Sequence, residues 1–121
     1  MNVFDVVRAA REARAAQPGR PATAVVHDGA DARLVVFRIA PGECVPLHRN
    51  ASTVQLTVLQ GAGVVTGGTE DVGTVDRACA AGDVVVYAPN ELHGMRAESE
   101  ELLLLATITP RPGGTQAGGS R

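Results

Sequence analysis

The sequence contains no lysine and no tryptophan, and its only aromatic residues are Phe4, Phe37 and Tyr87. All the positive charges are arginines, which are scattered along the chain, and the formal net charge is -2. A nucleic-acid-binding face needs clustered basic residues that displace counterions from phosphates, and no such cluster is present. We therefore expect no nucleic-acid partner.

The sequence also lacks a membrane segment and a cysteine framework. No apolar run approaches the ~20 residues that a membrane-spanning helix requires. Asp5 and Arg8 lie where a secretory signal would carry its apolar region, so we expect a cytoplasmic protein without a membrane partner. Only Cys44 and Cys79 are present. A chain of 121 residues can bury a core without disulfides, so we expect both to be free thiols.

What the sequence does contain is a large share of apolar residues. They make up 45% of the chain and are mostly Val, Ala and Leu, a composition that favours strands because Val packs well on a pleated sheet. From residue 22 onward, short Val-rich runs alternate with turn residues at the spacing of a sandwich or barrel. The expected strands lie near residues 22–27, 32–40, 44–49, 53–60, 62–66, 73–78, 83–88, 92–98 and 101–109.

The organisation expected from this pattern is a helix, a barrel and a tail. Residues 1–19 predict a short amphipathic α-helix that Asn2 caps. Its apolar face would consist of Val3, Val6, Val7 and Ala10. Residues 20–109 would form the barrel, and the Pro- and Gly-rich residues 110–121 predict a flexible tail.

Several expected strands are apolar on both faces, most clearly residues 102–105, which are four consecutive leucines. One face can line a barrel interior. The other face must be covered by a second sheet, by the N-terminal helix or by another chain. We therefore expect a homodimer.

Two segments contain the most informative motifs. Residues 42–61 read GECVPLHRNASTVQLTVLQG, and residues 82–97 read GDVVVYAPNELHGMRA. Together they resemble the two motifs of the cupin superfamily. The matching positions are Gly42, His48 and Gly61 in the first motif and Gly82, Asp83 and His93 in the second. The resemblance implies a small single-domain cupin, an all-β protein with a double-stranded β-helix or jelly-roll barrel.

The resemblance also implies a metal site with half of its usual ligands. In cupins, three His and one Glu typically hold Fe, Mn, Ni, Zn or a related divalent metal. Here His48 and His93 remain, whereas Asn50 and Val54 occupy the positions of the second His and the Glu. An amide oxygen binds such metals weakly, so Asn50 is a weak candidate ligand. The expected cofactor is one divalent transition metal in a reduced site, or none.

Side chains two positions apart on a strand share a face of the sheet. If His48 points into the barrel, then Cys44, Pro46 and Asn50 should point the same way. Cys44 is therefore a further candidate ligand. A buried cysteine more commonly acts as a small apolar residue.

On the strands that carry the rest of the pocket, the same alternation selects apolar residues. The expected pocket lining is Val54, Leu56, Val58 and Met95. A bulge at residues 50–53 would instead turn Gln55 inward, and the sequence leaves the choice between Val54 and Gln55 open.

Three functions follow from this arrangement. The first is a small-molecule-binding cupin, such as a sensor or carrier, with His48, Asn50 and His93 as polar groups in an apolar pocket. The alternative is a metal-dependent enzyme, such as a dioxygenase, isomerase or decarboxylase, with His48 and His93 as ligands. The third is an interaction protein whose filled barrel displays the helix and a dimer face. The sequence identifies neither a substrate nor a reaction.

Overall fold

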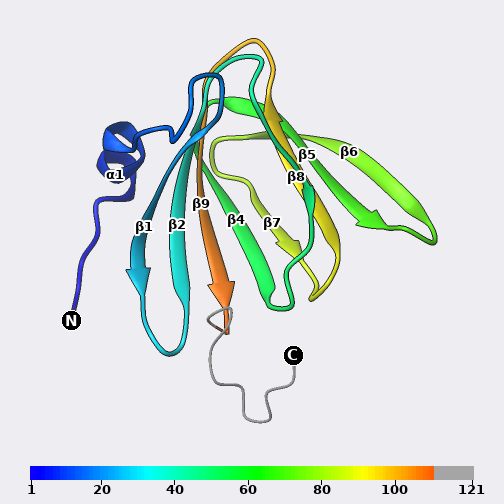
Figure 1. Ribbon diagram of the computed structural model, residues 1–121, viewed down its shortest axis with the longest axis horizontal. Coiled ribbons are helices and arrows are strands. Elements are labelled where there is room, and N and C mark those ends of the chain that lie inside the picture. Colours follow the sequence, from blue (N-terminus) through cyan, green and yellow to red (C-terminus); the bar gives the residue numbers. More distant parts are fainter. Residues whose placement is uncertain (111–121) are drawn as a thin grey trace.

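The computed structural model describes residues 1–110, and within them one helix and nine strands form two antiparallel sheets (Figure 1). The helix α1 spans Val6–Glu12. The strands are β1 (Ala22–Asp28), β2 (Arg33–Ile39), β3 (Cys44–His48), β4 (Thr53–Gln60), β5 (Ala62–Thr69), β6 (Gly73–Ala80), β7 (Val84–Tyr87), β8 (Leu92–Ala97) and β9 (Leu102–Thr109). Every expected strand is present, with its ends within three residues of the expected ones. The predicted tail lies outside the described residues, apart from Pro110.

The two sheets face each other as the walls of a jelly-roll barrel (Figure 1). The five-stranded sheet has the order β1-β2-β9-β4-β7, and the four-stranded sheet has the order β3-β8-β5-β6. The edge strands of the two sheets are not hydrogen-bonded to each other. One groove consequently opens between β1 and β3, and another opens between β6 and β7.

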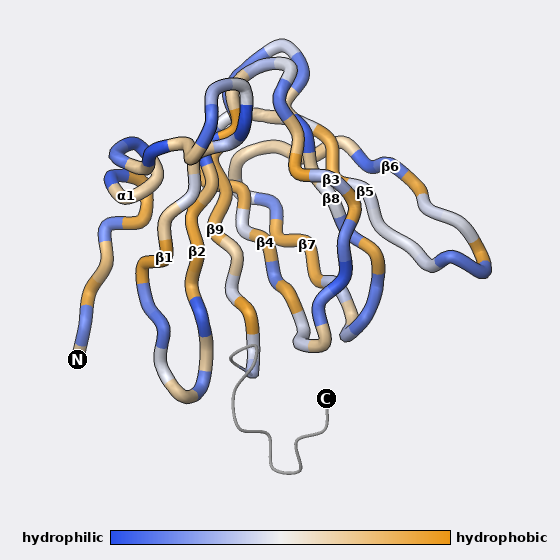
Figure 2. Tube along the Cα trace, viewed as in Figure 1, coloured by the Kyte–Doolittle hydropathy of each residue, from blue (hydrophilic) through white to orange (hydrophobic). Residues whose placement is uncertain are grey.

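The main core fills the space between the sheets. Leu56, Leu102 and Leu104 are fully buried in it, together with Ile39. The remaining leucines of the 102–105 run point to the outer face, where Leu103 is also fully buried. Figure 2 shows this apolar character along β2 and β9, which lie side by side in the five-stranded sheet.

The helix α1 provides the cover for the outer face. Ala10 is fully buried against Val36 and Leu103. The expected N-cap at Asn2 is wrong: the cap is Asp5, whose carboxylate accepts the backbone N–H of Arg8 at 3.0 Å. A carboxylate at this position pairs a helix-end donor that would otherwise lack a partner, so the helix begins at residue 6.

Because the helix begins later, fewer residues form its apolar face than expected. Val3 precedes the helix and is 88% exposed, whereas Val6 and Val7 pack beside Ala10 as expected. The helix α1, the one helix in residues 1–110, is too short to cross a membrane.

Candidate functional site

The centre of the candidate site is a pair of histidines on adjacent strands of the four-stranded sheet. His48 ends β3, His93 lies near the start of β8, and the two residues are directly opposite in the antiparallel register. Their ring centroids are 4.1 Å apart, with 60° between the ring planes. The two sequence motifs therefore meet at their histidines.

A β-bulge in β3 sets the orientation of His48. The register pairs Val45 with Met95 and then His48 with His93, so that Pro46 and Leu47 together face Gly94. An extra residue of this kind reverses the alternation of side chains along a strand. A side chain at position 94 would approach the Val45 carbonyl oxygen to 3.0 Å, so glycine suits this close approach.

The bulge corrects the expectation for Cys44. Val45, and not Cys44, shares the inner face with His48, because Val45 packs against the core and Cys44 lies opposite Arg96. Because Cys44 lies on the other face of the sheet, it is not part of a ligand set with the histidines. Both cysteines are free thiols, as expected. Burial raises the pKa of the Cys79 thiol.

Each histidine ring is held by a main-chain carbonyl two residues before it. Nδ1 of His48 lies 2.9 Å from the Pro46 oxygen, and Nδ1 of His93 lies 3.2 Å from the Glu91 oxygen. A carbonyl oxygen can only accept, so each Nδ1 carries the proton in these contacts. The neutral imidazole then has a free lone pair on Nε2, which can accept a hydrogen bond or bind a metal.

The His93 side chain is buried, yet its Nε2 atom remains accessible. The residue is 3% exposed, and its Nε2 makes no hydrogen bond or ion pair within residues 1–110. No side-chain nitrogen or oxygen in that part of the chain is both buried and unpartnered. The Nε2 atom must therefore reach solvent, next to the exposed His48. The pair presents two acceptor nitrogens to the same side of the sheet.

Burial also sets the charge of His93. Loss of solvation lowers its pKa below the ordinary 6.5, and the nearby His48 acts in the same direction, although the contact with the Glu91 carbonyl opposes both. At neutral pH, His93 is consequently an uncharged imidazole.

The third ring of the site belongs to Tyr87, which the motif analysis did not single out. Its ring centroid lies 4.8 Å from that of His93, and its hydroxyl donates to the Thr66 carbonyl oxygen at 3.0 Å. Burial raises the pKa of Tyr87 to about 12. Gly67 lies opposite His93 on β5, and a side chain there would approach the Tyr87 ring to 2.9 Å. Gly67 is the sequence feature that could have indicated the contact between the Tyr87 and His93 rings.

Asn50 holds together the two loops beside the histidines. Its side-chain oxygen accepts the Ser52 N–H at 2.8 Å, and its main-chain oxygen accepts the Asn90 N–H at 2.7 Å. The structure thus gives the Asn50 carbonyl a structural partner in place of a metal. Asn90 lies in the second motif segment, residues 82–97, and has a φ of 67°. Asparagine tolerates this left-handed conformation better than most residues.

The four apolar residues expected to line the pocket lie in the main core. Val54, Leu56, Val58 and Met95 are each 3% exposed or less and belong to one packed cluster. Gln55 is exposed, so Val54 is the residue that faces inward.

Comparison with known proteins identifies the family. A family model described as Cupin domain matches residues 35–109, which is more than half of the chain. The chain is a cupin. No curated protein sequence matches it significantly.

Solved structures have the same fold as this cupin. A conserved protein with a double-stranded β-helix domain from Klebsiella pneumoniae is 22% identical, with a TM-score of 0.78 over 94% of each chain. An RmlC-like cupin protein from Desulfovibrio desulfuricans is 25% identical, with a TM-score of 0.73 over 91% of this chain and 97% of that one. An oxalate decarboxylase from Lactobacillus farciminis in a formate complex is 17% identical, with a TM-score of 0.73 over 84% of this chain and 32% of that one.

The donor set of this cupin only partly fits the metal that many cupins bind. Imidazole nitrogens held through Nδ1 suit Fe, Mn, Ni or Zn, and His48 and His93 supply two of them. A catalytic metal usually has at least three protein ligands. Within residues 1–110, no group of three His, Cys, Asp or Glu side chains could hold an ion. The described residues therefore do not form a complete cupin metal site.

Proposed function

We propose that this cupin binds a small organic molecule at His48 and His93, in a site that needs no resident metal. The observation that carries the proposal is the accessible Nε2 atom of the otherwise buried His93, beside the His48 ring 4.1 Å away. A polar atom at the surface of a buried side chain is typical of a ligand-orienting group. Two Nε2 atoms that can accept hydrogen bonds favour a ligand that donates them, such as a hydroxyl or amide compound.

The rest of the site supports this proposal. The Tyr87 ring supplies an apolar wall next to His93, and the packed core below it sets a firm floor. The tie between Asn50 and Asn90 fixes the neighbouring loops before any ligand arrives, which reduces the entropic cost of binding. Asn50, Val54, Leu56, Val58 and Met95 act as supporting residues in this proposal.

The test is a thermal-shift screen with small polyols, hydroxy acids and amides on the chelator-treated protein. At least one compound should raise the unfolding temperature in proportion to the logarithm of its concentration. We expect the shift to disappear in His48→Gln and His93→Gln. His27→Gln serves as the matched control because His27 lies apart from the site, against Phe4 and Asp31. A shift that survives in both site variants would refute the proposal.

The second candidate function is a metal-dependent enzyme, such as a dioxygenase, isomerase or decarboxylase. The observation in its favour is the Nδ1 contact of both rings with main-chain carbonyls, which orients ligand histidines in many metal sites. Elemental analysis of protein purified without chelator separates the two functions. Stoichiometric metal in the wild type and His27→Ala, with loss in His48→Ala and His93→Ala, would favour the enzyme.

A further inference from the structure

We propose that the groove between β1 and β3 is a second binding site, separate from the histidine pair, for a small carboxylate with an apolar body. The groove opens because β1 and β3 are unpaired edges of different sheets. Its volume is about 360 Å³, near the lower end of the roughly 300–1,000 Å³ that small-molecule sites occupy. A ligand about the size of a single substituted ring suits this space.

One positive charge dominates the groove. Arg20 is the one charged residue among those that line it in the described part of the chain, and no carboxylate lines it. Arg20 makes no ion pair or hydrogen bond through its side chain within residues 1–110. By contrast, Arg11, Arg33 and Arg96 are paired with carboxylates. In a protein of net charge -2, an unpaired guanidinium in a groove attracts an anion.

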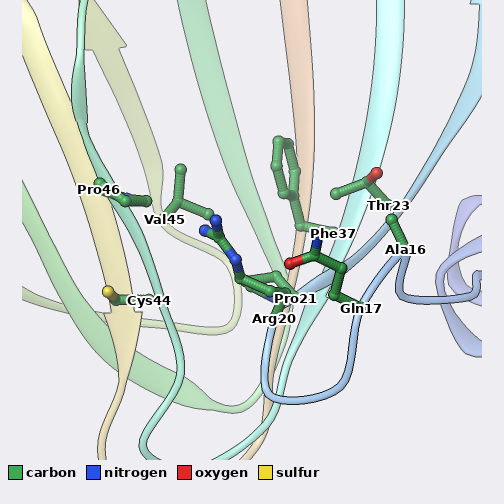
Figure 3. A pocket seen from close by; sticks show the side chains of 9 residues that line it. All are labelled: Ala16, Gln17, Arg20, Pro21, Thr23, Phe37, Cys44, Val45 and Pro46. Atoms are coloured by element: carbon green, nitrogen blue, oxygen red, sulfur yellow. The ribbon is translucent and has the colours of Figure 1, made fainter.

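The geometry of the groove favours a carboxylate over other anions. A guanidinium can donate two parallel hydrogen bonds to the two oxygens of one carboxylate. Figure 3 shows the side chains of Arg20 and Gln17 both entering the groove from the segment that precedes β1. The Gln17 amide can donate a further hydrogen bond to the same group. A single arginine balances a monoanion, whereas a phosphate dianion would remain partly uncompensated.

The walls of the groove favour an apolar body. Phe37, Val45 and Pro46 line it opposite the polar residues, and Phe37 and Val45 also pack against the main core (Figure 3). These two side chains are fixed by that packing, so a ligand ring can rest on them at little entropic cost. The site therefore has a charged rim and a preformed apolar base.

Benzoate and its neutral analogue benzamide are suitable probes. Titration of the full-length protein, followed by NMR chemical shifts or calorimetry, should give saturable benzoate binding that weakens as salt is added. We expect benzamide to bind at least tenfold more weakly. Arg20→Gln should weaken benzoate binding at least tenfold, whereas Arg20→Lys, which retains the charge without the two-pronged donor, should be intermediate.

Arg77→Gln is the matched control, because Arg77 is also unpaired within residues 1–110 but lines the groove on the opposite side of the barrel. It should leave benzoate affinity unchanged. His93→Gln should also leave it unchanged, which separates this site from the proposed function. The proposal is overturned if benzoate does not saturate, if benzamide binds equally well, or if Arg20→Gln and Arg77→Gln have the same effect.

Discussion

Gly61 joins β4 to β5 in the left-handed region, with a φ of 83°, and a side chain there would lie 1.9 Å from the Glu101 carbonyl oxygen. Gly42 has a similar φ of 86°, but a Cβ at this position would have no atom within 4 Å apart from its own chain neighbours. We expect Gly42→Ala to lower the free energy of unfolding by roughly 1–2 kcal/mol, the cost of the conformation alone. Gly61→Ala should cost clearly more, because the backbone must also move.

Urea unfolding of the two variants measures this difference. Equal losses in Gly61→Ala and Gly42→Ala would contradict the steric argument, because the conformational cost is common to both. The two glycines of the first motif therefore differ in what a side chain would cost, which is the conformation alone at Gly42 and the conformation plus a backbone clash at Gly61.

His93 should make stability depend on pH in the acid range. Its folded pKa lies below the 6.5 expected when the chain is unfolded. Between these two values the unfolded state binds the proton and the folded state does not, so stability falls as pH decreases below about 6.5. Above that pH the contribution is fully present.

Melting temperatures measured from pH 7.5 to 5 should show this slope, and His93→Gln should reduce it. NMR titration of the His93 C2 proton should give a midpoint below 6.5. A midpoint above that value would mean that solvation of the ring is not lost in the folded protein.

At the residue scale, the sequence predicted the identity of the central pair but not its surroundings. His48 and His93 followed from the motif spacing. The ring contact with Tyr87 depends on the missing side chain at Gly67, on a strand 20 residues away from Tyr87 in the chain, and no local pattern indicates such a neighbour. The role of Asn50 was also not visible, because its partners lie in loop main chain.

The outer face of β9 depends on one helix. Leu103 is fully buried beneath α1, whereas Leu105 is only half-buried beside it. Leu103→Ala should lower the free energy of unfolding by roughly 2–5 kcal/mol, as is typical for a fully buried leucine. Leu105→Ala should cost less. Chemical denaturation of both variants checks the order, and a larger loss at Leu105 would mean that α1 does not cover the sheet.

At the scale of elements, the sequence predicted all nine strands of residues 1–110 because period-two patterning and turn residues are local signals. It placed the helix cap three residues early, at Asn2, because Asn2 and Asp5 both carry side-chain oxygens that can cap a helix. The bulge in β3 depends on pairing with β8, which is not a local property.

At the scale of the whole molecule, some apolar residues on the outer face of the five-stranded sheet are not covered by α1. Val84 and Val86 on β7 are 53% and 62% exposed. The homodimer expected from the sequence stays a prediction, and this face is where we expect the second copy. Light scattering coupled to size exclusion should give twice the chain mass of 12.5 kDa. Val84→Glu combined with Val86→Glu should shift the protein toward the single-chain mass.

A mass of 12.5 kDa for the wild type would contradict the dimer. A dimer that persists in the double variant would place the contact on another face. Surface-exposed Val72→Glu, at the tip of the hairpin between β5 and β6, provides a control of equal charge change per substitution.

The bulge in β3 makes the direction of the His48 ring a matter of residue count and not of residue type. Leu47 is 48% exposed, so Leu47→Ser should keep both imidazoles in contact. Deletion of Leu47 should turn the His48 ring outward and separate it from the His93 ring, although every other residue of the site is still present. The ring-current shifts in the NMR spectrum report which of these arrangements is present. The number of residues between Val45 and His48 therefore determines which way the His48 ring points, whereas the identity of the residue at position 47 does not.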